Sequence, residues 1–402
     1  LVSYLHKLLV LLTGNFGKKG ADYRPSTLVP QAFNGEEGGT TPVTGAKVIG
    51  GLTPCNVVPE EILTDHPKRF RAMLVESGNP AHSIADGVRM REALAALELV
   101  VVIDVALTET ARLADYVLPV ASQFEKAEAV FFNFEFPNNY FFLRKALMPP
   151  LPGLFSEAAL HARLAAALGA LPKDAVEKLR TAWLESRVAF RTKFMELITA
   201  DARLAAVAPV LLYRAIGEFM PEGLTEGAGI WAICQIAAPR IASSLARAGF
   251  TGSPPDAADA LFDAMLASKS AITFSVDEWE ESFARVTTPN RRIQLAIAEL
   301  FDELDGLASE PERVDTEFPL ILSAGERRSF TANTIIRNPE WRKKDRAGAL
   351  RMHPDDAKRA GVADGGRVRL STRRGSAEVS VEISDRMHPG HISLPNGLGL
   401  DF

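Results

Sequence analysis

The chain has 402 residues, 47% of them hydrophobic, which is enough to build two or three domains with separate cores. Its 45 basic and 50 acidic residues give a formal net charge of −5, so no general attraction to nucleic acids or anionic membranes is expected. Cys55 and Cys234 are too few for a disulfide framework, a zinc site or an iron–sulfur cluster. The longest apolar stretches fall well short of the ~20 residues that span a bilayer, so no direct membrane insertion is expected. The two cysteines are compatible with a reducing compartment, and the cytoplasm is the expected location, with the periplasm as the alternative.

The first segment of the chain is predicted to be a short helix. Leucines recur through residues 1–13, and Gly14-Asn15 is typical of a helix end. A polar stretch rich in Gly, Pro and Thr follows to about residue 58 and is expected to be irregular and functional. The chain begins without methionine and stops soon after a glycine-rich segment, which predicts truncation at both ends.

Residues 72–103 have the pattern of a strand–helix–strand unit. The short apolar run Ala72–Val75 ends at a turn formed by Ser77-Gly78-Asn79-Pro80, where Gly and Asn allow a tight backbone. Ser83 and Asp86 predict an acidic capping box at the start of a helix. Leu99–Ile103 then predicts a strand buried on both faces, as in a parallel sheet covered by helices.

A carboxylate and a hydroxyl follow this second strand. Asp104 lies just beyond its carboxyl end, Thr108 is predicted to cap a helix, and Tyr116–Pro119 predicts another short strand. Open α/β sheets hold nucleotides at the carboxyl ends of their strands. The sequence therefore predicts a nucleotide crevice here, with a solvated strand-end aspartate and an ordinary cap as the structural alternative.

The middle of the chain shows no chemical signature. Residues 124–143 are predicted to form a partly buried loop, and the proline cluster at 149–152 marks a boundary. From 156 to about 310 the chain is alanine-rich and helical, and His161, Cys234 and Trp183 are interpreted as helix-face or core side chains.

The pattern changes to period two after Pro311. Alternating residues on both sides of Arg374-Gly375-Ser376 predict a hairpin, and Pro354 and Gly361 bound a short helix. We therefore expect a mostly antiparallel β-barrel at 316–402, after an α/β domain at 1–150 and a helical region at 151–315.

Four motifs give the chain a family resemblance. They are Leu12-Thr13-Gly14-Asn15-Phe16-Gly17 with Gly20; Ser77-Gly78-Asn79-Pro80; Asp104 with Thr108-Glu109-Thr110-Ala111 and 114–119; and His353-Pro354-Asp355-Asp356-Ala357 with 361–365. Each motif is weak alone, but their order and spacing resemble the C-terminal half of the molybdopterin oxidoreductases of the dimethyl sulfoxide reductase and formate dehydrogenase superfamily. The resemblance covers about 1–145 and 316–402.

The resemblance implies a fold and a cofactor. The fold would be a Rossmann-like parallel sheet domain, a helical middle region and a C-terminal β-barrel of the molybdopterin dinucleotide-binding type. The cofactor would be molybdopterin guanine dinucleotide with molybdenum or tungsten. The cofactor-binding residues that the resemblance implies are Gly45, Lys47, Gly78, Asn79, Pro80, Asp104, Thr108, Gly325, Arg327, Arg328 and Asn333.

Several of these positions keep alternatives. Asp104 and Thr108 would contact the nucleotide end, and Gly78-Asn79-Pro80 would present backbone or form a plain turn. Many relatives have an arginine at the position of Thr44, and Lys47 would supply the positive charge in its place. Gly325 would allow close approach of the backbone, and either Arg327 or Arg328 would grip a pyrophosphate or pterin carbonyl, unless the loop is simply solvated.

Asp115 and Glu125 fit the family pattern, with a structural salt bridge as the alternative. The histidines lack the partners of a zinc site, so no metal ligand is expected in this chain.

The family's molybdenum ligand and [4Fe-4S] cysteines belong to an N-terminal half that this sequence lacks, so no catalytic residue is assigned and the fragment alone is expected to be inactive. The intact protein would transfer two electrons to or from a small substrate of the formate or nitrate type, with an electron-transfer subunit as partner. The alternatives are a non-catalytic scaffold related to the complex I large subunit and a plain nucleotide-binding module. Retention of Asp104, Thr108 and the final β domain favours the first hypothesis.

Overall fold

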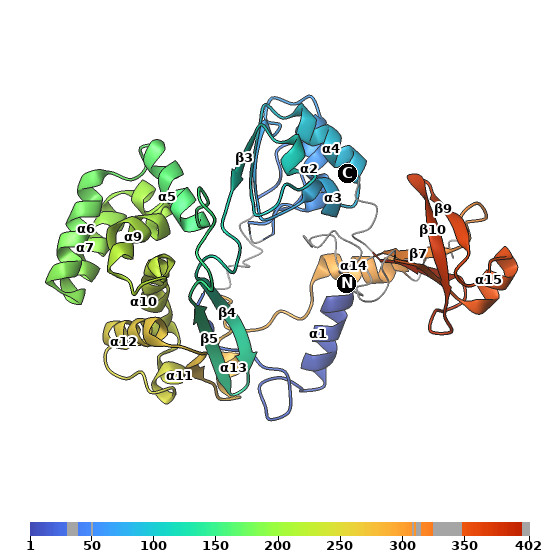
Figure 1. Ribbon diagram of the computed structural model, residues 1–402. Helices are drawn as coiled ribbons and strands as arrows, with labels where there is room; N and C mark the ends of the chain where they lie inside the picture. Colours follow the sequence, from blue (N-terminus) through green and yellow to red (C-terminus); the bar gives the residue numbers. More distant parts are fainter. Residues whose placement is uncertain (30–38, 50, 308, 311–314, 325–347, 396–402) are drawn as a thin grey trace. The chain divides into compact units, whose positions relative to one another are not determined.

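The computed structural model describes residues 1–29, 39–49, 51–307, 309–310, 315–324 and 348–395 (Figure 1). The chain divides into two compact units, and each unit combines two separate stretches of sequence. One unit is Leu1–Ala32 with Val120–Glu310, and the other is Phe33–Pro119 with Pro311–Phe402. The three consecutive domains expected from the sequence stay a prediction.

The first α/β body is built on a parallel sheet of order β1-β2-β3. Its elements are η1 (Cys55–Val57), α2 (Val58–Leu63), β1 (Ala72–Glu76), α3 (Pro80–Ser83), α4 (Gly87–Ala96), β2 (Leu99–Asp104), η2 (Ala111–Leu113) and β3 (Tyr116–Pro119). Met90 and Leu94 lie one turn apart on α4 and pack with Val100 and Val102 in one apolar cluster. The predicted strand–helix–strand unit is therefore confirmed.

The start of α4 differs from the prediction. Ser83 is the last residue of the separate short helix α3. Asp86 alone caps α4, because its carboxylate accepts a hydrogen bond from the Arg89 N–H at 3.1 Å. The predicted box between Ser83 and Asp86 is wrong, since the chain turns out of one helix before it enters the next.

An antiparallel sheet supports the helices of the other unit. It pairs β4 (Glu128–Glu135) with β5 (Asn138–Arg144), and β5 with β6 (Ile272–Val276). The loop predicted at 124–143 is thus wrong. Phe131 and Phe141 pack on the helical side of the sheet, whereas Val130 and Phe132 are 42% and 62% exposed. Because both faces of the strand carry apolar residues, its sequence lacks the alternation of apolar and polar residues that predicts a strand.

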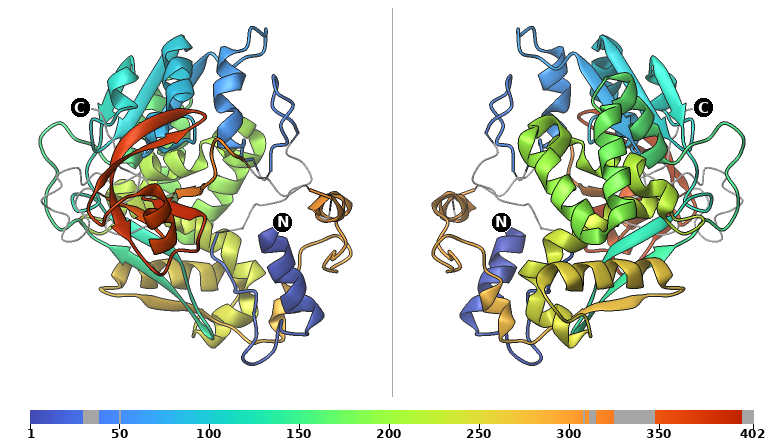
Figure 2. Two further views of the ribbon diagram at one scale, coloured as in Figure 1. Left: turned by 90° about the vertical axis from the view of Figure 1, so that its right-hand side faces the viewer. Right: turned by 90° about the vertical axis from the view of Figure 1, so that its left-hand side faces the viewer.

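Helices α5 to α12 of this unit gather on one side of strands β4 and β5, whereas α14 lies on the other side (Figures 1 and 2). The helices and helical turns after β5 are α5 (Glu157–Ala167), α6 (Lys173–Glu185), α7 (Arg187–Ala200), α8 (Ala202–Ala206), α9 (Ala208–Ile216), η3 (Gly217–Phe219), η4 (Thr225–Gly229), α10 (Ile230–Arg240), α11 (Ala242–Arg247), α12 (Pro254–Ala267), α13 (Glu281–Ala284) and α14 (Ala298–Leu307). Within the described ranges, none of the helices combines the length and the apolar run that a membrane crossing requires.

The side chains singled out in the helical region have structural roles, as expected. Cys234 is fully buried in the main apolar core, where burial raises the pKa of its thiol well above its ordinary value. Trp183 packs against the same core, and His161 is a half-buried residue of α5.

The N-terminal segment belongs to this helical unit. It starts with α1 (Val2–Leu12), which ends before Gly14 as predicted. Further along, the Ser26 N–H and the Asn139 Nδ2 both donate to Asp277 Oδ2, at 2.9 and 2.7 Å, and Arg285 donates to Asp277 Oδ1 at 2.7 Å. A buried carboxylate therefore joins the chain start to strands β5 and β6 and helix α13.

The C-terminal body is a five-stranded sheet of order β7-β11-β8-β10-β9 that curls into a half-barrel (Figure 1). Its elements are β7 (Ile321–Ala324), β8 (Leu350–Met352), α15 (Pro354–Ala360), β9 (Arg367–Thr372), β10 (Gly375–Ile383) and β11 (His391–Leu394).

The predicted hairpin and the predicted helix, which ends at left-handed Gly361, are both present in this body. The expectation of a mostly antiparallel structure is wrong, because β10 pairs in parallel with β8, and β11 in parallel with β7. Local alternation identifies strands but does not reveal the direction of partners that are far apart in the sequence.

Candidate functional site

The carboxyl ends of β1 and β2 form the candidate site, where open α/β folds place nucleotides. Ser77 follows β1, and its N–H donates to the Ile103 carbonyl of β2 at 3.0 Å. Its backbone has φ +51°, which lies in the left-handed region that residues other than glycine rarely adopt. Strained backbone of this kind clusters at ligand sites, because the surrounding structure must stabilise it.

Asp104 is the last residue of β2 and is only 8% exposed. Its Oδ1 accepts a hydrogen bond from the Ala106 N–H at 3.0 Å. In the described part of the chain this is the carboxylate's one hydrogen bond, so Oδ2 keeps its capacity to accept donors. A nearly buried carboxylate with a spare acceptor suits a ligand that presents N–H groups.

Thr108 lies on the loop that follows Asp104 and is 4% exposed. Its Oγ1 accepts from the Ala111 N–H at 3.1 Å, but the residue at the N-cap of the short turn η2 is Thr110, so the predicted helix cap at Thr108 is wrong. Its own N–H donates to the Ala106 carbonyl at 2.9 Å, which tightens the loop. The hydroxyl retains a hydrogen that can be donated to a ligand.

Asn79 links the two loops at this edge of the sheet. Its Oδ1 accepts from the Thr110 N–H at 3.1 Å and from the Thr110 hydroxyl at 2.8 Å, and its Nδ2 donates to Glu109 Oε2 at 2.5 Å. The predicted role of Asn79 and its neighbours Gly78 and Pro80 in presenting backbone to a cofactor stays a prediction. The side-chain role of Asn79 was missed from the sequence, because its partners lie about thirty positions away.

A buried glutamate fixes the glycine- and threonine-rich loop before α2. The Glu61 carboxylate accepts from the N–H groups of Val43 and Thr44, at 3.0 and 2.8 Å, and from the Thr44 hydroxyl at 2.7 Å. The N–H and hydroxyl of Thr44 are therefore both bound to Glu61. Lys47 is exposed, and Gly45 has a left-handed backbone at φ +68°. Sequence reasoning missed Glu61, because the two residues whose N–H groups it binds lie 18 and 17 positions away.

Four of the predicted cofactor contacts, Gly325, Arg327, Arg328 and Asn333, lie outside the described residues. Two further acids with open roles are placed. Asp115 accepts from the Val100 N–H at 2.7 Å, and Glu125 accepts from the N–H groups of Ser122 and Leu151 at 2.9 and 3.0 Å. Both carboxylates are therefore bound to backbone N–H groups. Among the described residues, no three His, Cys, Asp or Glu side chains lie close enough together to form a metal site.

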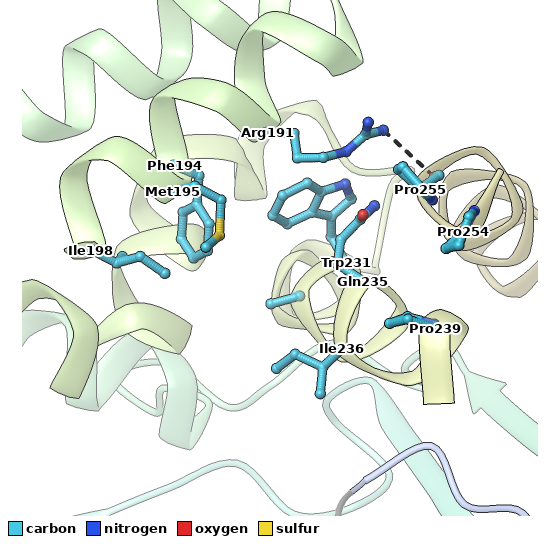
Figure 3. Close-up of a pocket in the computed structure, with 11 residues that line it drawn as sticks. Arg191, Phe194, Met195, Ile198, Trp231, Gln235, Ile236, Pro239, Pro254 and Pro255 are labelled. Carbon is cyan, nitrogen blue, oxygen red and sulfur yellow. Dashed lines mark hydrogen bonds between the residues drawn. The ribbon is translucent and has the colours of Figure 1, made fainter. Parts of the chain in front are cut away.

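A separate apolar pocket of about 370 Å³ lies among helices α7, α10 and α12 (Figure 3). Three polar side chains that line this pocket are hydrogen-bonded to Asp259. Trp231 and Gln235 donate to Asp259 Oδ1 at 3.0 and 2.7 Å, and Arg191 donates to Asp259 Oδ2 at 2.6 Å. The pocket therefore offers an apolar wall rather than a reactive group.

Two family models match the chain. The molybdopterin oxidoreductase family matches residues 5–151, and the molybdopterin dinucleotide-binding domain matches residues 320–400. The first range contains the sheet with Asp104, and the second contains the half-barrel.

Individual relatives agree with these matches. Formate dehydrogenase 1 subunit alpha of Methanococcus maripaludis is 24% identical over 96% of this chain and 49% of its own length. Dimethyl sulfoxide/trimethylamine N-oxide reductase of Rhodobacter capsulatus is 25% identical over 80% of this chain and 34% of its own length. The chain thus spans about half, or less, of the curated relatives it matches.

A solved structure supports the fold. Acetylene hydratase from Pelobacter acetylenicus aligns with a TM-score of 0.52 and 18% identity, over 89% of this chain and 40% of that one.

The two family models and the relatives together identify the family. The chain belongs to the molybdopterin oxidoreductases of the dimethyl sulfoxide reductase and formate dehydrogenase superfamily, and its two matched domains are those that bind the molybdenum cofactor, bis-molybdopterin guanine dinucleotide.

Proposed function

We propose that this chain forms the part of a molybdenum oxidoreductase that holds the guanine end of the cofactor. The observation that supports this assignment is Asp104, a nearly buried carboxylate with a spare acceptor at the carboxyl edge of a parallel sheet. When bound, the cofactor supplies two-electron chemistry at molybdenum, and the protein supplies binding and orientation.

The residues at this edge fit a guanine nucleotide. The Asp104 carboxylate would accept N–H donors of the base or hydroxyl groups of the ribose, and the Thr108 hydroxyl would donate beside it. Gly78 has no side chain to keep a ligand from its backbone, and an added Cβ would make ordinary contacts within the protein, the nearest at 3.7 Å. Lys47 and Gly45 would serve the pterin end, and either Arg327 or Arg328 would grip a pyrophosphate or pterin carbonyl.

The whole enzyme would oxidise or reduce a small substrate of the formate or nitrate type, with an electron-transfer subunit as partner. The matched relatives named as a formate dehydrogenase and a dimethyl sulfoxide reductase favour catalysis. The alternative of a non-catalytic scaffold related to complex I gains no support from them. That this fragment is inactive alone, and that the protein is cytoplasmic, stay predictions.

The test is Asp104→Asn in the full-length protein, with Glu98→Gln as the matched control. Glu98 precedes the same strand at its other end and forms an exposed pair with Arg71, so its replacement leaves the site intact. Losing a charge-assisted hydrogen bond should weaken guanine nucleotide binding about 10- to 100-fold. The measurement is guanine nucleotide and molybdenum released per chain on acid treatment. Equal release from the Asp104 variant and the control would refute the assignment.

A further inference from the structure

A buried polar cluster joins the loop after β1 to the loop after β2. Its members are Asn79, Glu109 and Thr110, which are 5%, 8% and 0% exposed. Burying an amide, a carboxylate and a hydroxyl together is costly unless they satisfy one another. They lie at the same edge of the sheet as Asp104, but their side chains are hydrogen-bonded to one another, whereas Asp104 keeps a spare acceptor.

The hydrogen bonds of the cluster define one orientation of the Asn79 amide. Its oxygen faces two donors, the Thr110 N–H and hydroxyl, and its nitrogen faces the Glu109 carboxylate. A flipped amide would place donor against donor and acceptor against acceptor, so the arrangement excludes it. The Thr110 hydroxyl also accepts from the Ala81 N–H at 3.1 Å, which extends the cluster to helix α3.

The cluster also borders the strained turn. Ser77, with φ +51°, lies two residues before Asn79, and strained backbone persists only where its neighbours over-determine it. On the other side, Glu109 and Thr110 directly follow Thr108, whose loop begins at Asp104. The three side chains therefore tie together the two segments that the proposed function assigns to nucleotide binding.

We propose that Asn79, Glu109 and Thr110 form a positioning clamp that holds the Ser77–Gly78 backbone and the Asp104–Thr108 loop in their ligand-binding geometry. The proposal rests on the proposed function, because it concerns the same nucleotide site. The side chains of the three residues act through the segments they hold and touch no ligand. Removing the Thr110 hydroxyl, which makes two hydrogen bonds in the clamp, should therefore lower the free energy of nucleotide binding more than the free energy of unfolding.

The experiment compares Thr110→Val with Thr110→Ser in the cofactor-free full-length protein. Valine keeps the shape of threonine but lacks the hydroxyl that binds Asn79 and the Ala81 N–H, whereas serine keeps that hydroxyl. Titration calorimetry with GDP as the probe should show about tenfold weaker binding for Thr110→Val, the scale of positioning losses at ligand sites. Thr110→Ser should bind GDP as the wild type does.

Two further readouts separate a positioning role from a structural one. Hydrogen exchange at residues 77–80 and 105–110 should speed up in Thr110→Val, and thermal melting in the absence of GDP reports general loss of stability. A Thr110→Val protein that melts earlier but binds GDP normally would overturn the clamp. If the wild type binds GDP and Asp104→Asn does not, the proposed function stands whatever the clamp variants do. A wild type that neither binds GDP nor releases guanine nucleotide would overturn the proposed function instead.

Discussion

Glu61→Gln should loosen the 41–46 loop and lower the free energy of unfolding. The Glu61 carboxylate is fully buried and accepts three hydrogen bonds from Val43 and Thr44. Glutamine keeps one oxygen toward Thr44 but turns its NH₂ group toward the Val43 N–H. One hydrogen bond is then lost and two donors face each other, which should cost about 1–3 kcal/mol.

The neighbouring Glu60 provides the control for this variant. Glu60 lies on the same helix, 44% exposed, and pairs with Arg89 at 3.4 Å, so Glu60→Gln should change stability by less than about 0.5 kcal/mol. Urea unfolding of both variants at neutral pH measures the difference. Equal midpoints for Glu60→Gln and Glu61→Gln would refute the account of the loop.

The pH dependence of this difference is a second readout. Burial by itself would raise the pKa of Glu61, but the hydrogen bonds from Thr44, Thr41 and Val43 outweigh it and hold the pKa below its ordinary value of 4.5. Because the folded-state pKa is depressed, the carboxylate's contribution is present above pH 4.5 and is lost as the pH falls through the folded-state pKa. The gap between wild type and Glu61→Gln should therefore narrow in acid, and a gap that widens would contradict this mechanism.

Two structural predictions concern the helical unit. Gly17→Ala should lower stability by about 2–4 kcal/mol in urea unfolding, because φ is +68° and the added Cβ would lie 2.9 Å from the Phe283 ring. Gly20→Ala, with φ +78° but open space around it, should cost only about 1 kcal/mol, and equal losses would exclude the ring contact as the cause. Although burial opposes it, hydrogen bonds led by the one from Arg247 lower the pKa of Glu281 from 4.5 to about 2, so its stabilisation should be lost between about pH 5 and 2. That lowering corresponds to at most about 3.4 kcal/mol, which solvent screening reduces to about 1–2 kcal/mol. Urea unfolding measured across this pH range should show this fall in the free energy of unfolding for the wild type but not for Glu281→Gln.

Local pattern sufficed to predict the strands and the main helix of the α/β body. Five apolar residues before Asp104 predicted β2, and the structure ends that strand at Asp104 itself. The αL end of α15 at Gly361 followed from glycine chemistry, whereas the left-handed residue of the turn after β1 is Ser77 and not Gly78. These features depend on residues close in sequence, so their physical causes can be identified without knowledge of the fold.

Features that depend on distant partners could not be predicted in this way. Strand β5 pairs with β6, which begins at Ile272, and nothing near Asn138 in sequence indicates that partner. The same holds for the hydrogen bonds between Asn79 and Thr110, which join positions 31 apart. Side-chain satisfaction inside a core is a property of the assembled structure, whereas hydrophobic periodicity is a property of the local chain.

The contact between Ser26 and Asp277 has a consequence for the order of folding. These residues are 251 positions apart, so the helical unit can close around them only after the ribosome has released almost the whole stretch between them. The β1–β3 body lies entirely within that stretch, and its strands pair with near neighbours. Because local pairings form faster than distant ones, we expect the β1–β3 body to be structured before the N-terminal segment contacts Asp277.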